Sequence, residues 1–510
     1  MFVRQTVQQR DTAGMKADGS TASCGELQPR EPELWRLTRA AVLAASAAVD
    51  RHLETGGWRP RCRLGTVRAF DSGWPHLTGP AFAADDAPVE YSALIGSKRG
   101  QLTPIAYDDV AEIAALLEYV RSRQELRARL VPRPDAASGE RLDRLIDFEA
   151  AELPLSLLDR SKAIGETSDE ELLALYLERE RAWLLDPLPF EYVVPLTLTA
   201  LDLQEPLVID ANIRLEPLDD RSQAARATST SLTLSSVPDT VIGAATHAIV
   251  LGNRQLANPG PGPRLLGVAD GPLDLSDADL VCEALRIVTH VDVGYAQVLR
   301  RPLGWADDWK FDLPRLTQIT TLRRYPDHFD NYGWLRRPNP IPRQVLDLLQ
   351  TVVQALRTAK PNVRLASRRL SLAALRDADD DRTVDACIGL EALLGEGRDE
   401  LRHRISLRAA TVLATRPHEP ANPEAIYTAM KKVYDHRSAV VHGAPGDRSR
   451  TIKLGEKTWT ADAVAIILLR EILSDALTRP GGWTAQSLDV ALLAALARPA
   501  DGEGTTDHSE

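Results

Sequence analysis

The sequence predicts a multidomain α+β protein, in which a helical and mixed α/β N-terminal region precedes an all-α C-terminal helical bundle. Two observations predict this fold class. Residues 343–478 carry apolar side chains at helical spacing, interrupted only by Gly- and Pro-rich breaks. Residues 190–217, in contrast, are rich in Val, Ile, Leu and Thr and alternate in part, which is typical of strands.

In chain order we expect five regions: a disordered leader (1–30), a mainly helical region (31–185), a strand-containing α+β region (186–340), the helical bundle (341–482) and a helix with a polar tail (483–510). The leader consists of small, polar and charged residues, a composition typical of disorder. The segment SLTLSS at 231–236 is a further candidate strand. Within the bundle, the expected helices are 343–358, 364–377, 381–394, 398–414, 423–442 and 460–478.

Composition and charge exclude several classes of protein. The 510 residues are 44% apolar and 26% charged, as in soluble globular chains, and a net charge of −11 excludes a global cationic field for nucleic acid. The four cysteines lie too far apart for metal-ligand spacing, so we expect neither a metal nor a cofactor. The N-terminus has no apolar signal region and no stretch of ~18 apolar residues occurs, so we expect a cytoplasmic protein without a membrane partner.

The first 340 residues contain no catalytic motif that we can identify. A P-loop, a GxGxxG after a strand, a GxSxG and an HExxH are all missing from this part of the sequence. Chemistry is therefore expected in the C-terminal bundle.

The predicted helix 423–442 places a charged residue on its apolar stripe. Arg437 lies four residues after Val433 and seven after Met430, so it shares their face. A charge on an apolar face is costly unless it is paired. Glu391 occupies the equivalent inward position on helix 381–394, so we expect it to lie near Arg437 or Arg408.

His442 ends the same helix, just before Gly443 and Pro445. Glycine suits the left-handed residue that closes a helix, and proline prevents its continuation. Five residues rotate an ideal helix by about 140°, so Arg437 and His442 point different ways unless the helix end distorts or a second chain contributes. An imidazole and a guanidinium around one phosphodiester could cleave RNA without a metal, the histidine exchanging a proton and the arginine stabilising the phosphorane.

The Arg-x4-His spacing alone is weak support for an active site. It occurs three times, ending at His328, His403 and His442. The structural alternative for the third is a helix C-terminus in which the histidine helps to satisfy carbonyl groups and Arg437 forms a buried ion pair.

The order of four motifs makes the spacing more specific. The runs RRLSLAALRDADDDRTVDACIGLEALLGEGRDELRHRISLRAATVLA and IYTAMKKVYDHRSAVVHG resemble the Apea-like branch of the HEPN superfamily over residues 364–443, and the resemblance extends to 480. The matching residues are Arg368, Arg369, Asp381, Arg382, Asp385, Leu390, Glu391, Ala392, Leu393, Leu394, Arg404, Arg408, Ala409, Ala410, Tyr434, Arg437, Ser438, Val441, His442 and Gly443. One departure is Leu370, where the family often has an aromatic residue.

The resemblance implies a dimerising bundle with Arg437 and His442 as the catalytic pair of a metal-independent endoribonuclease. We expect Glu391, Ser438, Asp385 and Tyr434 to support this pair. It further implies an effector of prokaryotic antiphage defence or growth arrest, whose partners are RNA, a second copy of the chain and a phage-derived or cellular trigger sensed by the N-terminal region. The alternative is a catalytically inactive HEPN dimer that serves as an RNA- or protein-binding module, because some members of the superfamily have lost catalysis.

The remaining polar residues of the bundle carry weaker predictions. Residues 364–408 hold nine arginines and nine carboxylates, which indicates ion pairing more than a phosphate-binding surface. Arg368, Arg369 and Arg408 remain minor candidates for RNA backbone contacts. Tyr434 could stack on a base, although a packed core tyrosine is the alternative. Asp385 could also cap its helix or pair with Arg382.

Overall fold

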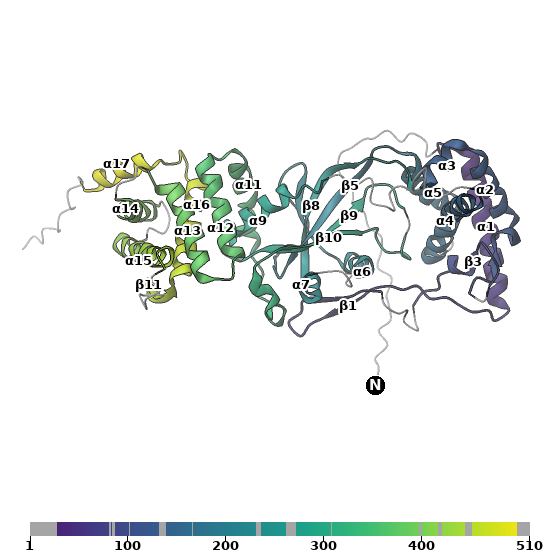
Figure 1. Ribbon diagram of the computed structural model, residues 1–510, viewed down its shortest axis with the longest axis horizontal. Helices are drawn as coiled ribbons and strands as arrows, with labels where there is room; N and C mark the ends of the chain where they lie inside the picture. Colours follow the sequence, from purple (N-terminus) through teal and green to yellow (C-terminus); the bar gives the residue numbers. More distant parts are fainter. Residues whose placement is uncertain are drawn as a thin grey trace, which may run out of the picture.

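The chain forms an elongated molecule in which three groups of elements follow one another along the long axis (Figure 1). The computed structural model describes residues 28–496, except for 81–82, 84–86, 101, 132–138, 166, 231–235, 262–271, 308, 397–399, 417–420 and 444–450. The N-terminal helices lie at one end, a β-sheet lies in the middle, and the C-terminal helices lie at the other end. The mixed α/β fold class that the sequence predicts is therefore confirmed.

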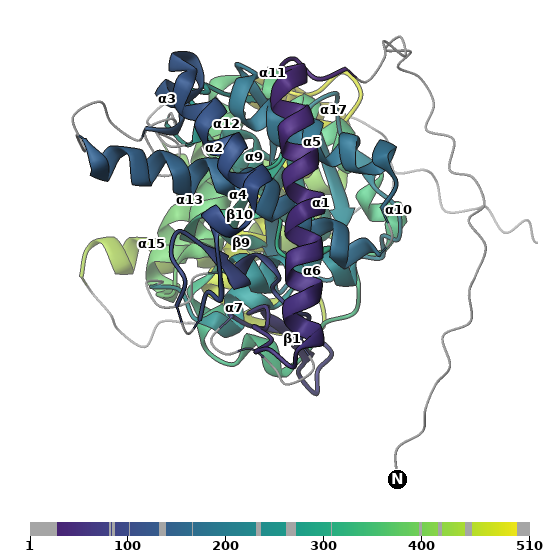
Figure 2. The same cartoon turned by 90° about the vertical axis from the view of Figure 1, so that its right-hand side faces the viewer.

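The N-terminal group is held together by five helices with one apolar core. They are α1 (Pro32–Glu54), α2 (Ala111–Ser122), α3 (Gln124–Leu130), α4 (Glu140–Ile164) and α5 (Asp169–Leu184). α1 runs across the end of the molecule in Figure 2. The helix α5 begins with a capping box, because Ser168 accepts a hydrogen bond from the Glu171 amide and Glu171 accepts one in return.

Short elements connect α1 to α2. They are β1 (Thr66–Ala69), β2 (Pro75–Thr78), η1 (Ser92–Leu94), β3 (Ile95–Gly96), β4 (Ile105–Ala106) and η2 (Tyr107–Asp109). β1 and β2 form an antiparallel hairpin, and β1 passes below the sheet in Figure 1.

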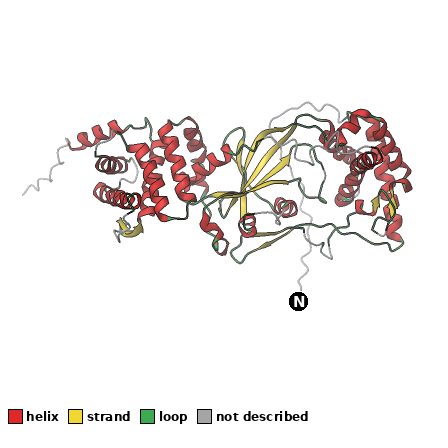
Figure 3. Ribbon diagram, viewed as in Figure 1, coloured by secondary structure: helices red, strands yellow, loops and turns green. Residues whose placement is uncertain are grey.

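The central sheet has six antiparallel strands, shown in yellow in Figure 3. The strand order is β10 (Thr317–Arg324), β9 (Gly294–Pro302), β5 (Leu188–Thr197), β8 (Ala245–Leu256), β7 (Ile213–Pro217) and β6 (Leu207–Val208). α6 (Asp220–Ser229) packs on one face, and α9 (Ser276–Thr289) covers the other. A short helix, α7 (Asp239–Gly243), contacts β2 and β9. The turn between β10 and the bundle contains η4 (Asp327–Asp330) and η5 (Gly333–Leu335).

The C-terminal bundle consists of α10 (Arg343–Leu346), α11 (Leu349–Thr358), α12 (Pro361–Leu375), α13 (Asp379–Leu394), α14 (Leu401–Ala414), α15 (Pro423–Val441), α16 (Ala461–Thr478) and α17 (Ala485–Leu496). Three aspartates open α13, where the helix dipole favours negative charge. One apolar core continues from the sheet through α9 into α11, α12 and α16. The bundle is therefore joined to the sheet through α9.

Two expectations for the bundle are wrong in detail. Residues 343–478 are not purely helical, because β11 (Thr451–Leu454) and β12 (Lys457–Thr460) form a hairpin between α15 and α16. Gly455, with a φ of 65°, allows the tight turn between them. The single helix expected at 343–358 is broken into α10 and α11.

Several expectations concern residues outside the described part of the chain. The candidate strand at 231–236 falls almost wholly among them, as do residues 1–27 of the expected leader and residues 497–510 of the expected tail. The HEPN arrangement of the bundle stays a prediction.

Candidate functional site

The Arg437–His442 segment lies at the C-terminal end of α15, whose two ends follow from local sequence. Asn422 caps the first turn by accepting a hydrogen bond from the Ala425 amide at 3.0 Å, and Pro423 occupies the first helical position. At the other end, His442 is the C-cap and Gly443 adopts the left-handed conformation with a φ of 63°. The predicted helix terminus at Gly443 is confirmed.

His442 is exposed, and its amide donates to the Ser438 carbonyl at 3.0 Å. Within the described residues, no group forms a hydrogen bond or an ion pair with its imidazole ring. Ser438 is exposed as well. The imidazole is thus free to meet a ligand or a second subunit.

Arg437 has a different environment, because it is tied to a carboxylate of its own subunit. Its Nη2 lies 3.5 Å from Oε1 of Glu391 on α13, and the two side chains are 29% and 24% exposed. Its Nε is buried without a hydrogen-bond partner among the described residues. The prediction that Glu391 lies near Arg437 or Arg408 is confirmed for Arg437.

Tyr434 completes this cluster from the side of the core. Its hydroxyl donates to the same Oε1 of Glu391 at 2.5 Å, and the residue is only 7% exposed. Burial, followed by the adjacent carboxylate, raises the pKa of Tyr434 far above its ordinary value, so the phenol stays protonated. Tyr434 is therefore the packed tyrosine of the alternative interpretation, since its buried ring has no face open to a base.

Asp385 forms a separate ion-pair cluster. Its carboxylate accepts from Arg369 at 2.6 Å and from Arg376 at 3.0 Å, and its side chain is 5% exposed. Of the two structural roles considered for Asp385, pairing with Arg382 does not occur, because Arg382 lies 3.4 Å from Asp462 instead. Asp385 links α12 to α13 and cannot support the Arg437–His442 pair directly.

The three arginines proposed for RNA backbone contacts have different environments. Arg408 is wrong as a phosphate ligand: its side chain is 4% exposed and donates to both oxygens of Asp489 and to the Leu394 carbonyl. Arg369 is held by its aspartate partner. Arg368 is exposed, so it alone of the three is open to solvent without a partner among the described residues.

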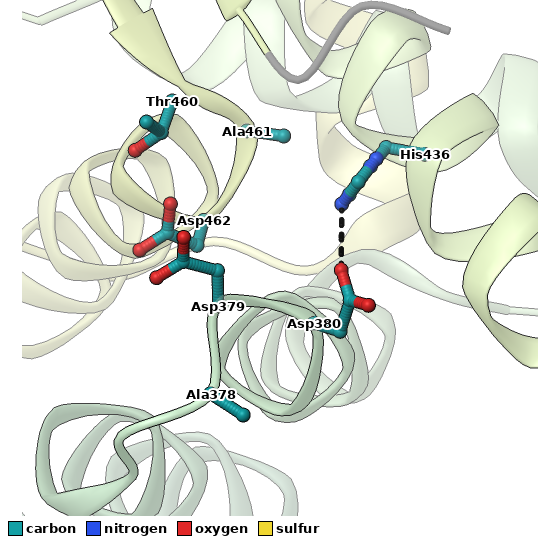
Figure 4. Close-up of a pocket in the computed structure, with 7 residues that line it drawn as sticks. All are labelled: Ala378, Asp379, Asp380, His436, Thr460, Ala461 and Asp462. Atoms are coloured by element: carbon teal, nitrogen blue, oxygen red, sulfur yellow. Dashed lines mark ion pairs between the residues drawn. The ribbon is translucent and has the colours of Figure 1, made fainter. Parts of the chain in front are cut away.

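A pocket beside α15 contains a histidine that the sequence interpretation missed. His436 Nε2 lies 3.3 Å from Asp380 Oδ1, as Figure 4 shows. The pocket has a volume of about 260 Å³ and is lined by Ala378, Asp379, Asp380, His436, Thr460, Ala461 and Asp462. It forms where the N-termini of α13 and α16 meet α15, and its lining is acidic. The sequence offered one signal for this pocket, the histidine directly before Arg437. The pocket could not be predicted from it, because only the hairpin β11–β12 brings Thr460 close to His436.

Comparisons with known proteins add no relative: no family model matches the chain, and neither the curated proteins nor the solved structures contain a significant match. In the described residues, no three His, Cys, Asp or Glu side chains are grouped as metal ligands would be. None of the described helices combines the length and the apolar character needed to cross a lipid bilayer.

Proposed function

We propose that this protein is a metal-independent endoribonuclease of the HEPN type, acting in prokaryotic antiphage defence or growth arrest. The observation that carries the proposal is the exposed imidazole of His442, which has no hydrogen-bond or ion-pair partner among the described residues and lies at the end of α15, five residues after Arg437. The order of the surrounding motifs in the sequence supports it independently. The N-terminal helices and the sheet would then sense the trigger.

The chemistry follows from the two side chains. The substrate 2′-oxygen attacks the neighbouring phosphorus, and the bond from phosphorus to the 5′-oxygen breaks. The proton of the 2′-hydroxyl passes to a neutral imidazole, and the leaving 5′-oxygen takes a proton from an imidazolium. Arg437 would stabilise the negative charge of the phosphorane, since guanidinium groups match phosphate oxygens well. The products carry a 2′,3′-cyclic phosphate and a 5′-hydroxyl.

A homodimer would supply what one subunit lacks. Ideal helix geometry separates Arg437 and His442 by about 140° around α15. Two protomers that meet through this helix end would place two imidazoles and two guanidinium groups around one groove, so one His442 can act as the base and the other as the acid.

The second candidate function is a catalytically inactive dimer that binds RNA or protein. One observation favours it: the guanidinium of Arg437 already faces Glu391 of its own subunit, which is the arrangement expected of a structural ion pair. In this case Arg437 would stay in the bundle, and His442 would only contribute to the surface.

Cleavage of total RNA in the presence of EDTA separates the two functions. The wild type, His442→Ala and the control His328→Ala are compared, because His328 also follows an arginine by five residues and is exposed, with its nearest carboxylate oxygen 4.0 Å away. Fragments with 2′,3′-cyclic phosphate ends from the wild type and His328→Ala, but not from His442→Ala, are the expected result. Equal inactivity of all three folded proteins, with RNA binding retained, would favour the inactive dimer.

A further inference from the structure

A row of aromatic rings lies outside the bundle, where the β1–β2 hairpin meets the turn that contains η5. The rings follow one another in the order His76, Phe70, Trp334 and Tyr332, with centroid separations of 4.7, 6.4 and 6.2 Å. We call these four residues the aromatic row. The hairpin itself runs below the sheet in Figure 1.

The two segments that form the aromatic row are fixed to each other although they are far apart in sequence. The indole of Trp74 donates to the Arg336 carbonyl at 2.9 Å, and the Ser72 hydroxyl donates to the Trp334 carbonyl. Gly333 lies so close to the sheet that a Cβ would stand 2.6 Å from Cδ1 of Leu198. These contacts therefore fix the position of the backbone that carries the rings.

Tyr332, at the end of the aromatic row, is exposed and adopts an unfavourable backbone conformation. Its side chain is 71% exposed and its backbone φ is 71°, the left-handed region that bulky residues avoid. Leu335, three residues on, is 61% exposed. Strained non-glycine residues gather at functional sites, because the surrounding structure must hold them in place. An exposed, strained tyrosine beside a partly buried tryptophan is what a stacking surface needs.

The two segments that carry the aromatic row, 66–78 and 331–337, contain three arginines and a single acidic residue, the exposed Asp71, although the whole protein is acidic. Arg336 and Arg68 are exposed and have no carboxylate partner in the described part of the chain. Arg337 lies over the Trp74 ring at 5.0 Å and donates to the Gly73 carbonyl, again without a carboxylate. The nearby Arg323, in contrast, is paired with two aspartates. The unpaired guanidinium groups favour an anionic ligand.

We propose that this surface binds single-stranded nucleic acid, with bases stacked on Tyr332 and Trp334 and phosphates held by Arg336 and Arg337. Every base offers a π-face, and the bases of a single strand are free to leave one another and stack on protein rings. A duplex hides these faces, and an acidic peptide has no bases. The choice of RNA over DNA rests on the proposed ribonuclease function.

The test uses the full-length protein with His442→Ala, so that cleavage does not consume the probe. A fluorescein-labelled mixed-sequence RNA strand, the same DNA strand and an RNA duplex are titrated, and anisotropy is measured. Tyr332→Ala is expected to weaken single-strand RNA binding by about fivefold to a hundredfold. Trp58→Ala is the matched control, since Trp58 is 50% exposed outside the row. Arg336→Ala is expected to lower the salt slope of binding by about 0.7.

The outcomes separate this surface from the active site. Binding of RNA that is lost in Tyr332→Ala and kept in Trp58→Ala supports the surface, even if the wild type cleaves no RNA and the ribonuclease proposal fails. Equal binding of RNA and DNA overturns the choice of RNA. Unchanged RNA affinity in Tyr332→Ala, or no binding of any strand, overturns the surface itself, and loss of self-association in Tyr332→Ala would then identify a protein interface. Circular dichroism of each variant checks the fold.

Discussion

Glu391 should contribute to stability through one strong hydrogen bond and one weak ion pair. Glu391→Gln keeps an oxygen for the Tyr434 hydroxyl but removes the negative charge. A bond to a charged acceptor is worth about 1 kcal/mol more than one to a neutral acceptor. The Arg437 contact is 3.5 Å long and about a quarter exposed on both sides, so after discounting for solvent it adds about 0.5 kcal/mol. We expect Glu391→Gln to lower the free energy of unfolding by about 1.5 kcal/mol.

Glu391→Ala should cost more, about 2.5–4.5 kcal/mol in total, because it also leaves the buried Tyr434 hydroxyl without an acceptor, which adds about 1–3 kcal/mol. Urea denaturation measures each value as a shift in midpoint at constant slope. Asp435→Asn is the control: it breaks a 2.7 Å ion pair with Arg402 whose partners are 48% and 53% exposed, so it should change stability by less than about 0.5 kcal/mol.

The reasoning fails if Glu391→Gln is as costly as Glu391→Ala, or as mild as Asp435→Asn. A double-mutant cycle with Tyr434→Phe should show coupling, since both changes remove the same bond. Activity lost in Glu391→Ala therefore cannot be assigned to chemistry alone, whereas the exposed His442 can be replaced with little effect on folding.

Three further predictions concern the bundle. Arg408→Met removes three hydrogen bonds from a 4% exposed guanidinium and should cost about 2–3 kcal/mol in urea denaturation; a cost near zero contradicts the tie to Asp489. Gly389→Ala places a Cβ 2.7 Å from Cδ2 of the buried Leu469; the overpacking cost of about 1–3 kcal/mol exceeds the gain in helix propensity of about 1 kcal/mol, so the melting temperature should fall, whereas an unchanged melting temperature would mean that the Leu469 side chain moves aside. The raised pKa of Tyr434 stabilises the fold below the ordinary tyrosine pKa of about 10, and this stability is lost as pH rises above it. In Tyr434→Phe, the urea midpoint should fall less steeply as the pH rises through the alkaline range. A pH profile identical to that of the wild type would contradict the role assigned to Tyr434.

Some helix ends were predicted from a single residue type, although the expected start at 364 missed Pro361, which opens α12. Pro423 opens α15 and Gly443 closes it, each by a backbone preference that needs no distant partner. The hairpin β11–β12 was missed because its strands are four residues each, too short for a periodic pattern to stand out. The signal that remained was Gly455 between two alternating segments.

Side-chain partners were predicted only where helix periodicity gives direction. Glu391 and Arg437 both fall on inward faces, and their pairing follows. Arg408 was a candidate for RNA on charge alone, but its partner Asp489 lies 81 residues away on α17, and no local rule connects them. The His436–Asp380 pair and the aromatic row likewise join segments that are distant in the chain.

The sequence by itself determined the α+β class, most helix boundaries and the position of Arg437 and His442 near one helix end, because these depend on periodicity and on the backbone preferences of Pro and Gly. The tertiary structure decided which charges are available. It buries Arg408, holds Arg437 against Glu391, and leaves His442, Tyr332 and Arg336 facing solvent. Exposure and pairing depend on neighbours brought together by folding, so an isolated side chain in the sequence does not reveal them.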